Sequence, residues 1–475
     1  PISRSNVGEI EYRLSLYRDG ERLSNTEGAF NLYNFCRGFE IRERIDRSTI
    51  EAQFVFEDAA GIINMMTGHE ELKLQITSSI VDRTYNFRIY CVHSRSRTNN
   101  SNDAFLVEAC STEFITNESV SVFGQSEVIF QNPEASSIVE KLLKERRYLN
   151  TSKKVFTEDT INNQKFTAPN WRPMDTIYWL AQRSVRKSRK GGVLQNGFLF
   201  YENALGYHFR SVDGLIDDIN DQTFDKQTNK ITGKPRCYKY HYSPKKVDNT
   251  GADAFTISGI TFPREKHLLE LMRDGSFSGF SVGFDPVTLG SSKMGSSTEL
   301  TTDDPHYELD ETWDKMSHLD GKKTVNPLTQ LDPSVHKMVS KPRRIRYSFL
   351  PNQTFDPKFI NNPQANYQEL IDLQAYQFMR LESLKNIQLK ITIPGNLDLY
   401  AGGGIDVIIP ANFKSGRQTP LDRKYSGRYL ISSVTHNTTG TCLLYTSPSP
   451  RDQRGSGMAA WGLKKKGGGG GGGGG

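Results

Sequence analysis

The feature that most constrains the fold is a series of short segments in which apolar and polar residues alternate. A period of two is that of a β-strand with one buried face. The pattern is clearest over residues 39–56, where one face would hold Phe39, Ile41, Ile45, Ile50, Ala52, Phe54 and Phe56. Asp19-Gly20 indicates a hairpin turn. Residues 9–112 therefore predict about seven short strands that fold as a small sandwich or barrel.

The pattern changes after residue 115, where apolar residues recur at helical spacing. A helix with one apolar face is expected over 172–190, and Gly191-Gly192 would end it. A hairpin over 197–211 follows, so this region predicts a small α+β unit.

The second half mixes irregular and regular segments. Residues 286–340 are rich in Gly, Ser, Thr, Asp and Pro and show little periodicity, which indicates a long insertion with extended loops. A helix is expected over 366–384. Short segments rich in β-branched residues predict strands at 235–243, 387–394, 404–412 and 427–437. The chain is long enough for about three or four domains.

Charge and cysteine content exclude several classes of protein. The net charge is +6, but residues 442–475 hold five cations and one anion, so the rest carries only +2. That balance is a weak sign of nucleic-acid binding. Four scattered cysteines before residue 442, with no C-x-x-C pair, predict neither a disulfide framework nor a zinc cluster. No run of apolar residues is long enough to predict membrane insertion.

Residues 442–475 are unlike the rest of the chain. With one choice of codons, Cys442 to Asp452 back-translate to the end of a transposon-type sequencing adapter, and three lysines and nine glycines follow as AAA and GGG repeats would encode. We expect genuine protein to stop at about Thr441, so that the final strand or strands of a barrel are lost. Any ordered strand at 442–446 would then occupy the place of a missing one. Pro1 in place of Met suggests that the other end is cut too.

One motif resembles a hydrolase signature. Gly279-Phe280-Ser281-Val282-Gly283 matches G-x-S-x-G, in which the serine sits on a strained turn between a strand and a helix. Pro286 opposes a helix directly after the motif, so an ordinary strand serine is the simpler interpretation. We predict no catalytic residue.

The remaining motifs also favour structural roles. His69-Glu70 lacks the second histidine of a zinc helix, and Gly402-Gly403-Gly404 precedes a strand, so it predicts a turn and not a phosphate loop. A basic run predicts a solvated helix end, with a contact to an acidic partner or to DNA as the alternative; it comprises Arg183, Arg186, Lys187, Arg189 and Lys190. The histidines expected to lie alone on strands are His93, His208, His241 and His436. No metal-binding or cofactor-binding residue is predicted.

Four stretches, in their order along the chain, resemble the central hub protein of contractile-phage baseplates of the T-even type. They begin "GFEIRERIDRS", "DTIYWLAQRSV", "IPGNLDLYAGG" and "SGRYLISSVTH", and they lie at 38–76, 175–216, 393–412 and 426–437.

The resemblance implies a mainly β fold with two similar tube-type β-barrels, an α+β middle domain and a loop-rich insertion. The first barrel would span 1–115 and the α+β domain 116–215, with the second, C-terminally truncated barrel at 216–245 and 366–441, the insertion at 246–365 and the non-native tail at 442–475.

It also implies a function without catalysis or cofactors. Three chains would form a ring in the virion baseplate, assembled in the host bacterial cytoplasm. The ring would join the sixfold tail tube to the trimeric spike, a tail-lysozyme-type protein, and DNA would pass through it transiently. Two alternatives remain open: a tail-associated cell-wall hydrolase with its chemistry in 244–365, and a hub or spike component of a contractile secretion system.

Overall fold

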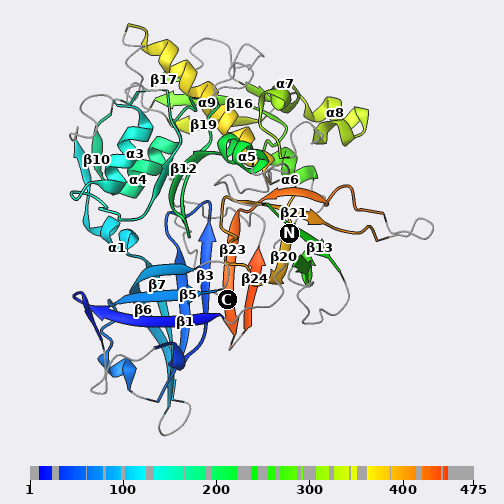
Figure 1. The fold of residues 1–475 in the computed structure, drawn as a ribbon. Coiled ribbons are helices and arrows are strands. Elements are labelled where there is room, and N and C mark those ends of the chain that lie inside the picture. Colours follow the sequence, from blue (N-terminus) through cyan, green and yellow to red (C-terminus); the bar gives the residue numbers. More distant parts are fainter. Residues whose placement is uncertain are drawn as a thin grey trace, which may run out of the picture.

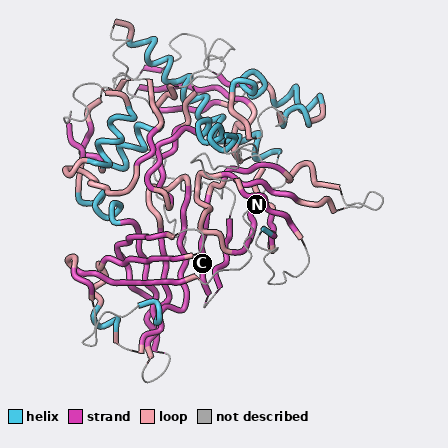
Figure 2. Tube along the Cα trace, in the orientation of Figure 1, coloured by secondary structure: helices cyan, strands magenta, loops and turns pink. Residues whose placement is uncertain are grey.

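The structure is a computed structural model of the whole chain. It describes residues 10–23, 32–59, 61–78, 82–97, 102–124, 133–161, 163–164, 166–187, 195–221, 237–243, 255–263, 268–285, 290–291, 306–319, 326–341, 344–349, 361–385, 387–412, 420–439 and 442–447. The chain is mainly β with helical parts, as predicted. Two groups of strands lie side by side at one end, and most of the helices lie at the other end (Figures 1 and 2).

The first strand group forms a curved antiparallel sheet in the order β3-β4-β7-β6-β5-β1. Its elements are β1 (Glu11–Arg18), β2 (Glu21–Arg22), η1 (Leu32–Phe35), β3 (Cys36–Arg44), β4 (Glu51–Asp58), η2 (Ile62–Met65), β5 (Glu71–Thr77), β6 (Arg83–Arg97) and β7 (Asp103–Ser111). The predicted turn joins β1 to β2, and Asp19 and Gly20 both adopt the positive φ that a tight hairpin requires. The sheet curls until the rings of Tyr12 on β1 and Phe39 on β3 touch, 5.6 Å apart between centroids.

The second strand group comes from distant parts of the chain. Its elements are β13 (Tyr238–Tyr242), β14 (Thr256–Ile257), β15 (Gly259–Thr261), β20 (Lys390–Pro394), β21 (Gly404–Ile408), β22 (Gly427–Leu430), β23 (Ser433–Thr439) and β24 (Cys442–Ser447). One sheet runs β15-β20-β24-β23 and the other β14-β13-β21-β22. Because β14 continues into β15 and β22 into β23, two bent strands connect the sheets at both sides. The group therefore closes on itself.

An antiparallel ladder between β3 and β23 joins the first group to the β15-β20-β24-β23 sheet of the second, which gives one continuous sheet of eleven strands among the described residues. Residues 442–447 form β24, which pairs with β20 on one side and with β23 on the other. The origin of these residues stays a prediction. Strands β14 and β15 lie inside the range predicted as the insertion, yet they pair with β13 and β20.

The middle region packs helices on small sheets around its own core, as the helix and hairpin patterns predict. Its largest sheet has the order β11-β12-β9. Residues Ile138, Leu142, Ile177 and Phe209 are fully buried in this core. The elements are α1 (Thr112–Ser119), β8 (Val122–Gly124), α3 (Ala135–Lys144), β9 (Val155–Thr157), β10 (Ala168–Trp171), α4 (Pro173–Ala181), β11 (Phe198–Asn203), β12 (Gly206–Ser211) and α5 (Val212–Asp221).

The insertion is more ordered than its composition predicts. It holds α6 (Leu268–Arg273), β16 (Ser278–Asp285), β17 (Gly290–Ser291), β18 (His306–Glu308), α7 (Leu309–Thr312), η4 (Trp313–Lys315), η6 (Pro327–Gln330), α8 (Pro333–Val339) and β19 (Ile345–Phe349). These elements share a core with α9 (Pro363–Ser383), in which Leu309, Leu328 and Met379 are fully buried. The prediction of mainly loops was wrong for the described part, because each segment is too short to show a period by itself. No helix in the described part of the chain has the length and apolarity to cross a membrane.

Candidate functional site

Ser281 lies in the middle of strand β16 and not on a turn. Strand β18 pairs along one side of β16 and β19 along the other. The serine is 1 % exposed, and its hydroxyl has no hydrogen-bond partner among the described residues. A nucleophile elbow instead presents its serine at a sharp strand-to-helix turn. The G-x-S-x-G match therefore lacks the geometry of a hydrolase site.

The His-Glu and triple-glycine motifs have structural roles. His69 lies in the loop before β5, where its Nδ1 is 3.1 Å from the Thr67 hydroxyl. Burial raises the pKa of neighbouring Glu70, but hydrogen bonds from Arg18 and Thr67 more than offset this and lower it to about 2. Gly402 has a φ of +87°, so the predicted turn is confirmed.

The basic run is not the end of a helix, because α4 already stops at Ala181. Arg183 is 5 % exposed and lies over the Trp179 ring, 3.9 Å from its centroid, and burial lowers the pKa of Arg183 to about 9. Arg186 is also buried and pairs with Glu158 and with Asp217 at 2.8 Å. The prediction of a solvated run was wrong for these two arginines. Both side chains are buried, that of Arg183 over the Trp179 ring and that of Arg186 against two carboxylates. Lys187 is exposed, and 189–190 lie outside the described residues.

A carboxylate is buried where three regions meet. Glu43 on β3 is fully buried and accepts backbone hydrogen bonds from Ala204, between β11 and β12, at 3.1 Å, and from Ala401, before β21, at 3.2 Å. Burial raises the pKa of Glu43 to about 7. Sequence reasoning missed this residue. The available signal was a glutamate between Ile41 and Ile45, at an inward position of an otherwise apolar pattern.

A cluster of three charged side chains lies between the first strand group and the middle region. The Lys153 ammonium group is 2.6 Å from carboxylate oxygens of both Glu113 and Glu202. Glu202 also accepts a hydrogen bond from the backbone N–H of Ile50 at 3.2 Å. Because a buried charge is costly unless it is paired, these contacts favour one relative position of the two regions.

The β3–β23 ladder connects two strands that lie far apart in the sequence. It runs through seven residue pairs, from Ser433 opposite Arg44 to Thr439 opposite Gly38. The hydroxyl of Thr438 also accepts a hydrogen bond from the backbone N–H of Phe39 at 3.1 Å. The two strand groups are therefore held edge to edge by backbone hydrogen bonds. This junction between β3 and β23 is our candidate for the functional site.

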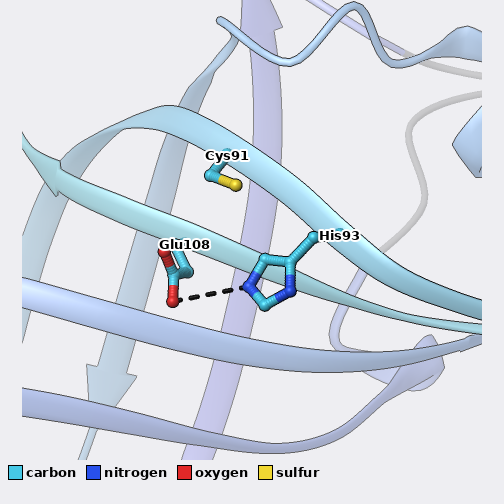
Figure 3. A group of neighbouring side chains, drawn as sticks. All are labelled: Cys91, His93 and Glu108. Atoms are coloured by element: carbon cyan, nitrogen blue, oxygen red, sulfur yellow. Dashed lines mark ion pairs between the residues drawn. The ribbon is translucent and has the colours of Figure 1, made fainter. Parts of the chain in front are cut away.

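One group of side chains has the chemistry of a metal site (Figure 3). Cys91 and His93 on β6 and Glu108 on β7 bring their ligand atoms within 4.8 Å of one another. His93 Nε2 is 3.4 Å from Glu108 Oε1. The prediction that His93 lies alone on its strand was wrong, because cross-strand pairing brings Glu108 to it. The C-x-H spacing, which puts both side chains on one strand face, was the available signal.

Comparisons with known proteins give likenesses to solved structures alone. No protein-family profile matches the chain, and no curated protein sequence matches it. A tail protein from Neisseria meningitidis MC58 has a TM-score of 0.49 and 10 % identity, over 92 % of this chain and 95 % of that one. The 43 kDa tail protein of prophage MuSo2 from Shewanella oneidensis has a TM-score of 0.46 and 8 % identity, over 92 % and 97 %.

A third likeness is to the E. coli c3393 protein, described as a type VI secretion component with structural similarity to T4 tail proteins gp27 and gp5. Its TM-score is 0.37 at 12 % identity, over 88 % of this chain and 74 % of that one. At TM-scores below 0.5, these likenesses do not establish a shared fold.

Proposed function

We propose that the chain is a non-enzymatic hub of a contractile phage-tail baseplate, in which three copies form a ring that joins a sixfold tail tube to a threefold spike. The observation that carries this proposal is internal to the chain. Its two strand groups follow the same order, so one polypeptide would present the same module twice. Three such chains present six modules, which is what a threefold ring needs in order to meet a sixfold neighbour.

The equivalence follows from numbering six strands in each group along the chain, with each bent strand counted once. The first group runs β3-β4-β7-β6-β5-β1, and the second runs β14/β15-β20-β24-β22/β23-β21-β13. Both orders read second, third, sixth, fifth, fourth, first. Five strands also agree in direction. The first strand differs, because β1 is antiparallel to β5 whereas β13 is parallel to β21.

Strand β24 takes the sixth position of the second group, the counterpart of β7. If residues 442–475 are foreign, the native residues after Thr441 would fill this position instead. Re-reading the source DNA across codon 441 tests that part of the proposal. An uninterrupted coding sequence without the adapter would contradict it.

Free strand edges support closure of the ring. Within one chain, the second strand of the first group (β3) pairs with the fifth strand of the second group (β23). The reverse pairing would join the second strand of the second group (β15) to the fifth strand of the first group (β6), and it is not made within the described part of one chain. Among the described residues, β15 pairs with β20 alone, and residues 91–97 of β6 pair with β7 alone. Unpaired edges favour further pairing. We therefore assign β15 of one copy to β6 of the next, which closes a ring without exposed edges.

Partners and location follow from the same proposal. The ring would contact tail-tube proteins on one side and the spike protein on the other, in a virion baseplate assembled in the host cytoplasm. DNA would cross the channel of the ring. Each phosphate that a protein cation neutralises adds affinity, and tight binding would oppose the passage of DNA. A net charge of only +2 outside 442–475 is therefore compatible with passage. A contractile secretion system could use the same ring, and co-purification with a tube and spike from one or the other system separates the two.

The test measures oligomeric state by light scattering during size-exclusion chromatography. Strand β15 pairs Gly259 with Thr392, Ile260 with Ile391 and Thr261 with Lys390, and among the described residues no backbone bond from Phe262 or Ile393 extends this ladder. Gly259 and Thr261 therefore form the hydrogen-bonded pairs, and the N–H of Ile260 points to the open edge. Ile260→Pro removes this donor and should convert trimer to monomer, whereas Ile260→Val keeps it and should remain a trimer. A monomeric wild-type protein would contradict the hub. An Ile260→Pro trimer as stable as Ile260→Val would contradict the assigned edge.

A peptidoglycan-cleavage assay tests the hydrolase alternative. We expect no cleavage by the wild-type chain, since Ser281 is buried within a strand. Clearing of cell walls that is lost in Ser281→Ala would overturn the hub proposal.

A further inference from the structure

We propose that Cys91, His93 and Glu108 form a zinc-binding site on the outer face of the first strand group. In Figure 3, the three side chains converge from the neighbouring strands β6 and β7. This goes beyond the hub function and does not depend on the oligomeric state. It also replaces the expectation from the cysteine pattern that the chain holds no metal.

A β-bulge creates this arrangement. The pairing of β6 with β7 shifts register between Ile89, opposite Ala109, and Cys91, opposite Glu108. Tyr90 is the extra residue. In an unbroken ladder Tyr90 would face Glu108, and Cys91 would point into the core beside Val107. Bulges of this kind re-aim side chains and are frequent beside functional sites.

The distances suit a tetrahedral zinc ion. Zinc lies about 2.0–2.1 Å from imidazole nitrogen and carboxylate oxygen, so two such ligands at the tetrahedral angle are about 3.3 Å apart. The observed separation of His93 Nε2 and Glu108 Oε1 is 3.4 Å. Cys91 Sγ lies within 4.8 Å of a ring nitrogen of His93 and of a carboxylate oxygen of Glu108, where the same geometry requires about 3.6 Å. A rotation of the Cys91 side chain therefore completes a three-residue set with the fourth position open to water.

Neighbouring groups orient two of the ligands. His93 Nδ1 is 2.8 Å from the Ser94 hydroxyl. A proton on Nδ1 donated to this hydroxyl leaves the Nε2 lone pair facing Glu108, as metal binding requires. The Gln53 side-chain amide donates to Glu108 Oε1 at 3.2 Å and holds the carboxylate in place.

The donor set favours zinc over other common ions. Thiolate and imidazole ligands suit zinc, whereas magnesium and calcium prefer oxygen alone. The contrasting interpretation is an ion pair between protonated His93 and Glu108, with Cys91 uninvolved. A metal titration separates the two, because the ion pair needs no metal and no thiol.

The first experiment measures zinc bound to the purified chain after equilibrium dialysis against zinc chloride. We expect one zinc per chain and a decrease in affinity of about tenfold or more in His93→Ala, with a similar loss in Glu108→Gln. The matched control His69→Ala changes a loop histidine and should bind like the wild type. Circular dichroism confirms folding of each variant. Absence of bound zinc from the wild-type chain would overturn the site, as would unchanged binding in both His93→Ala and Glu108→Gln.

The second experiment tests the thiolate with cobalt(II) as the probe. The wild-type chain should develop a sulfur-to-cobalt charge-transfer band that Cys91→Ser lacks. Cys237→Ser, which alters a cysteine beside Asp406 in the second strand group, should keep the band. A band of equal strength in Cys91→Ser would show that another thiol binds the metal and would refute the assignment.

Discussion

Replacing Glu43 by glutamine should remove a specific pH dependence of stability. The Glu43 carboxyl group is fully buried, and burial raises its pKa from the ordinary value of 4.5 to about 7. The native state therefore holds the proton more tightly than the unfolded chain. The resulting stabilisation is fully present below pH 4.5 and is lost as the pH rises through about 7.

The magnitude follows from the two pKa values. Their difference corresponds to roughly 3 kcal/mol of stability, most of which is lost between about pH 5 and about pH 8. Glutamine keeps the shape of the side chain and an oxygen that accepts from Ala204 or Ala401, but it does not titrate. The free energy of unfolding of Glu43→Gln minus that of the wild type should therefore increase by about 2–3 kcal/mol over this range. Arg83 and Glu202 also influence Glu43, and their own contributions cancel in the difference to the extent that they are unchanged.

Hydrogen exchange at the amides of Ala204 and Ala401 is the most direct assay, because both donate to Glu43 and report opening of this junction. Urea unfolding at each pH gives the global value. Glu40→Gln is the matched control, since Glu40 lies on the other face of β3, beside Arg42, and is partly exposed. A difference between Glu43→Gln and wild type that stays constant from about pH 5 to about pH 8 would refute the reasoning.

Two further substitutions test the packing. Asp213→Asn removes the charged partner of Arg380, whose Nε is 3.2 Å from the Asp213 carboxylate, and both side chains are almost fully buried. The substitution should lower the free energy of urea unfolding by about 3–5 kcal/mol. A loss below about 1 kcal/mol would contradict a buried charge pair. Gly402→Ala would place its Cβ against the Tyr201 hydroxyl at a positive φ, and its melting temperature should fall further than that of Gly20→Ala, which has the same φ sign and open space around it. Equal shifts in the two variants would show that the contact with Tyr201 is not limiting.

The sequence by itself determined the local elements. Alternation placed Phe54 and Phe56 on the buried face of β4, and Asp19-Gly20 fixed the hairpin after β1. Helical spacing predicted α9 to within about three residues. These features depend on neighbours a few residues apart, whose periodicity records which face is buried.

Only the tertiary structure decided which strands pair and which polar groups are buried. The ladder between β3 and β23 joins residues nearly four hundred positions apart, and no local pattern encodes such a partner. From the sequence alone Arg186 is expected at the surface, because Glu158 and Asp217, with which it pairs, lie about thirty residues away on either side. Cys91 and His93 meet Glu108 only through a bulge, which shifts the register of one strand by a single residue. Pairing and register are set by the packing of the whole core, and for that reason they have no signature within one segment.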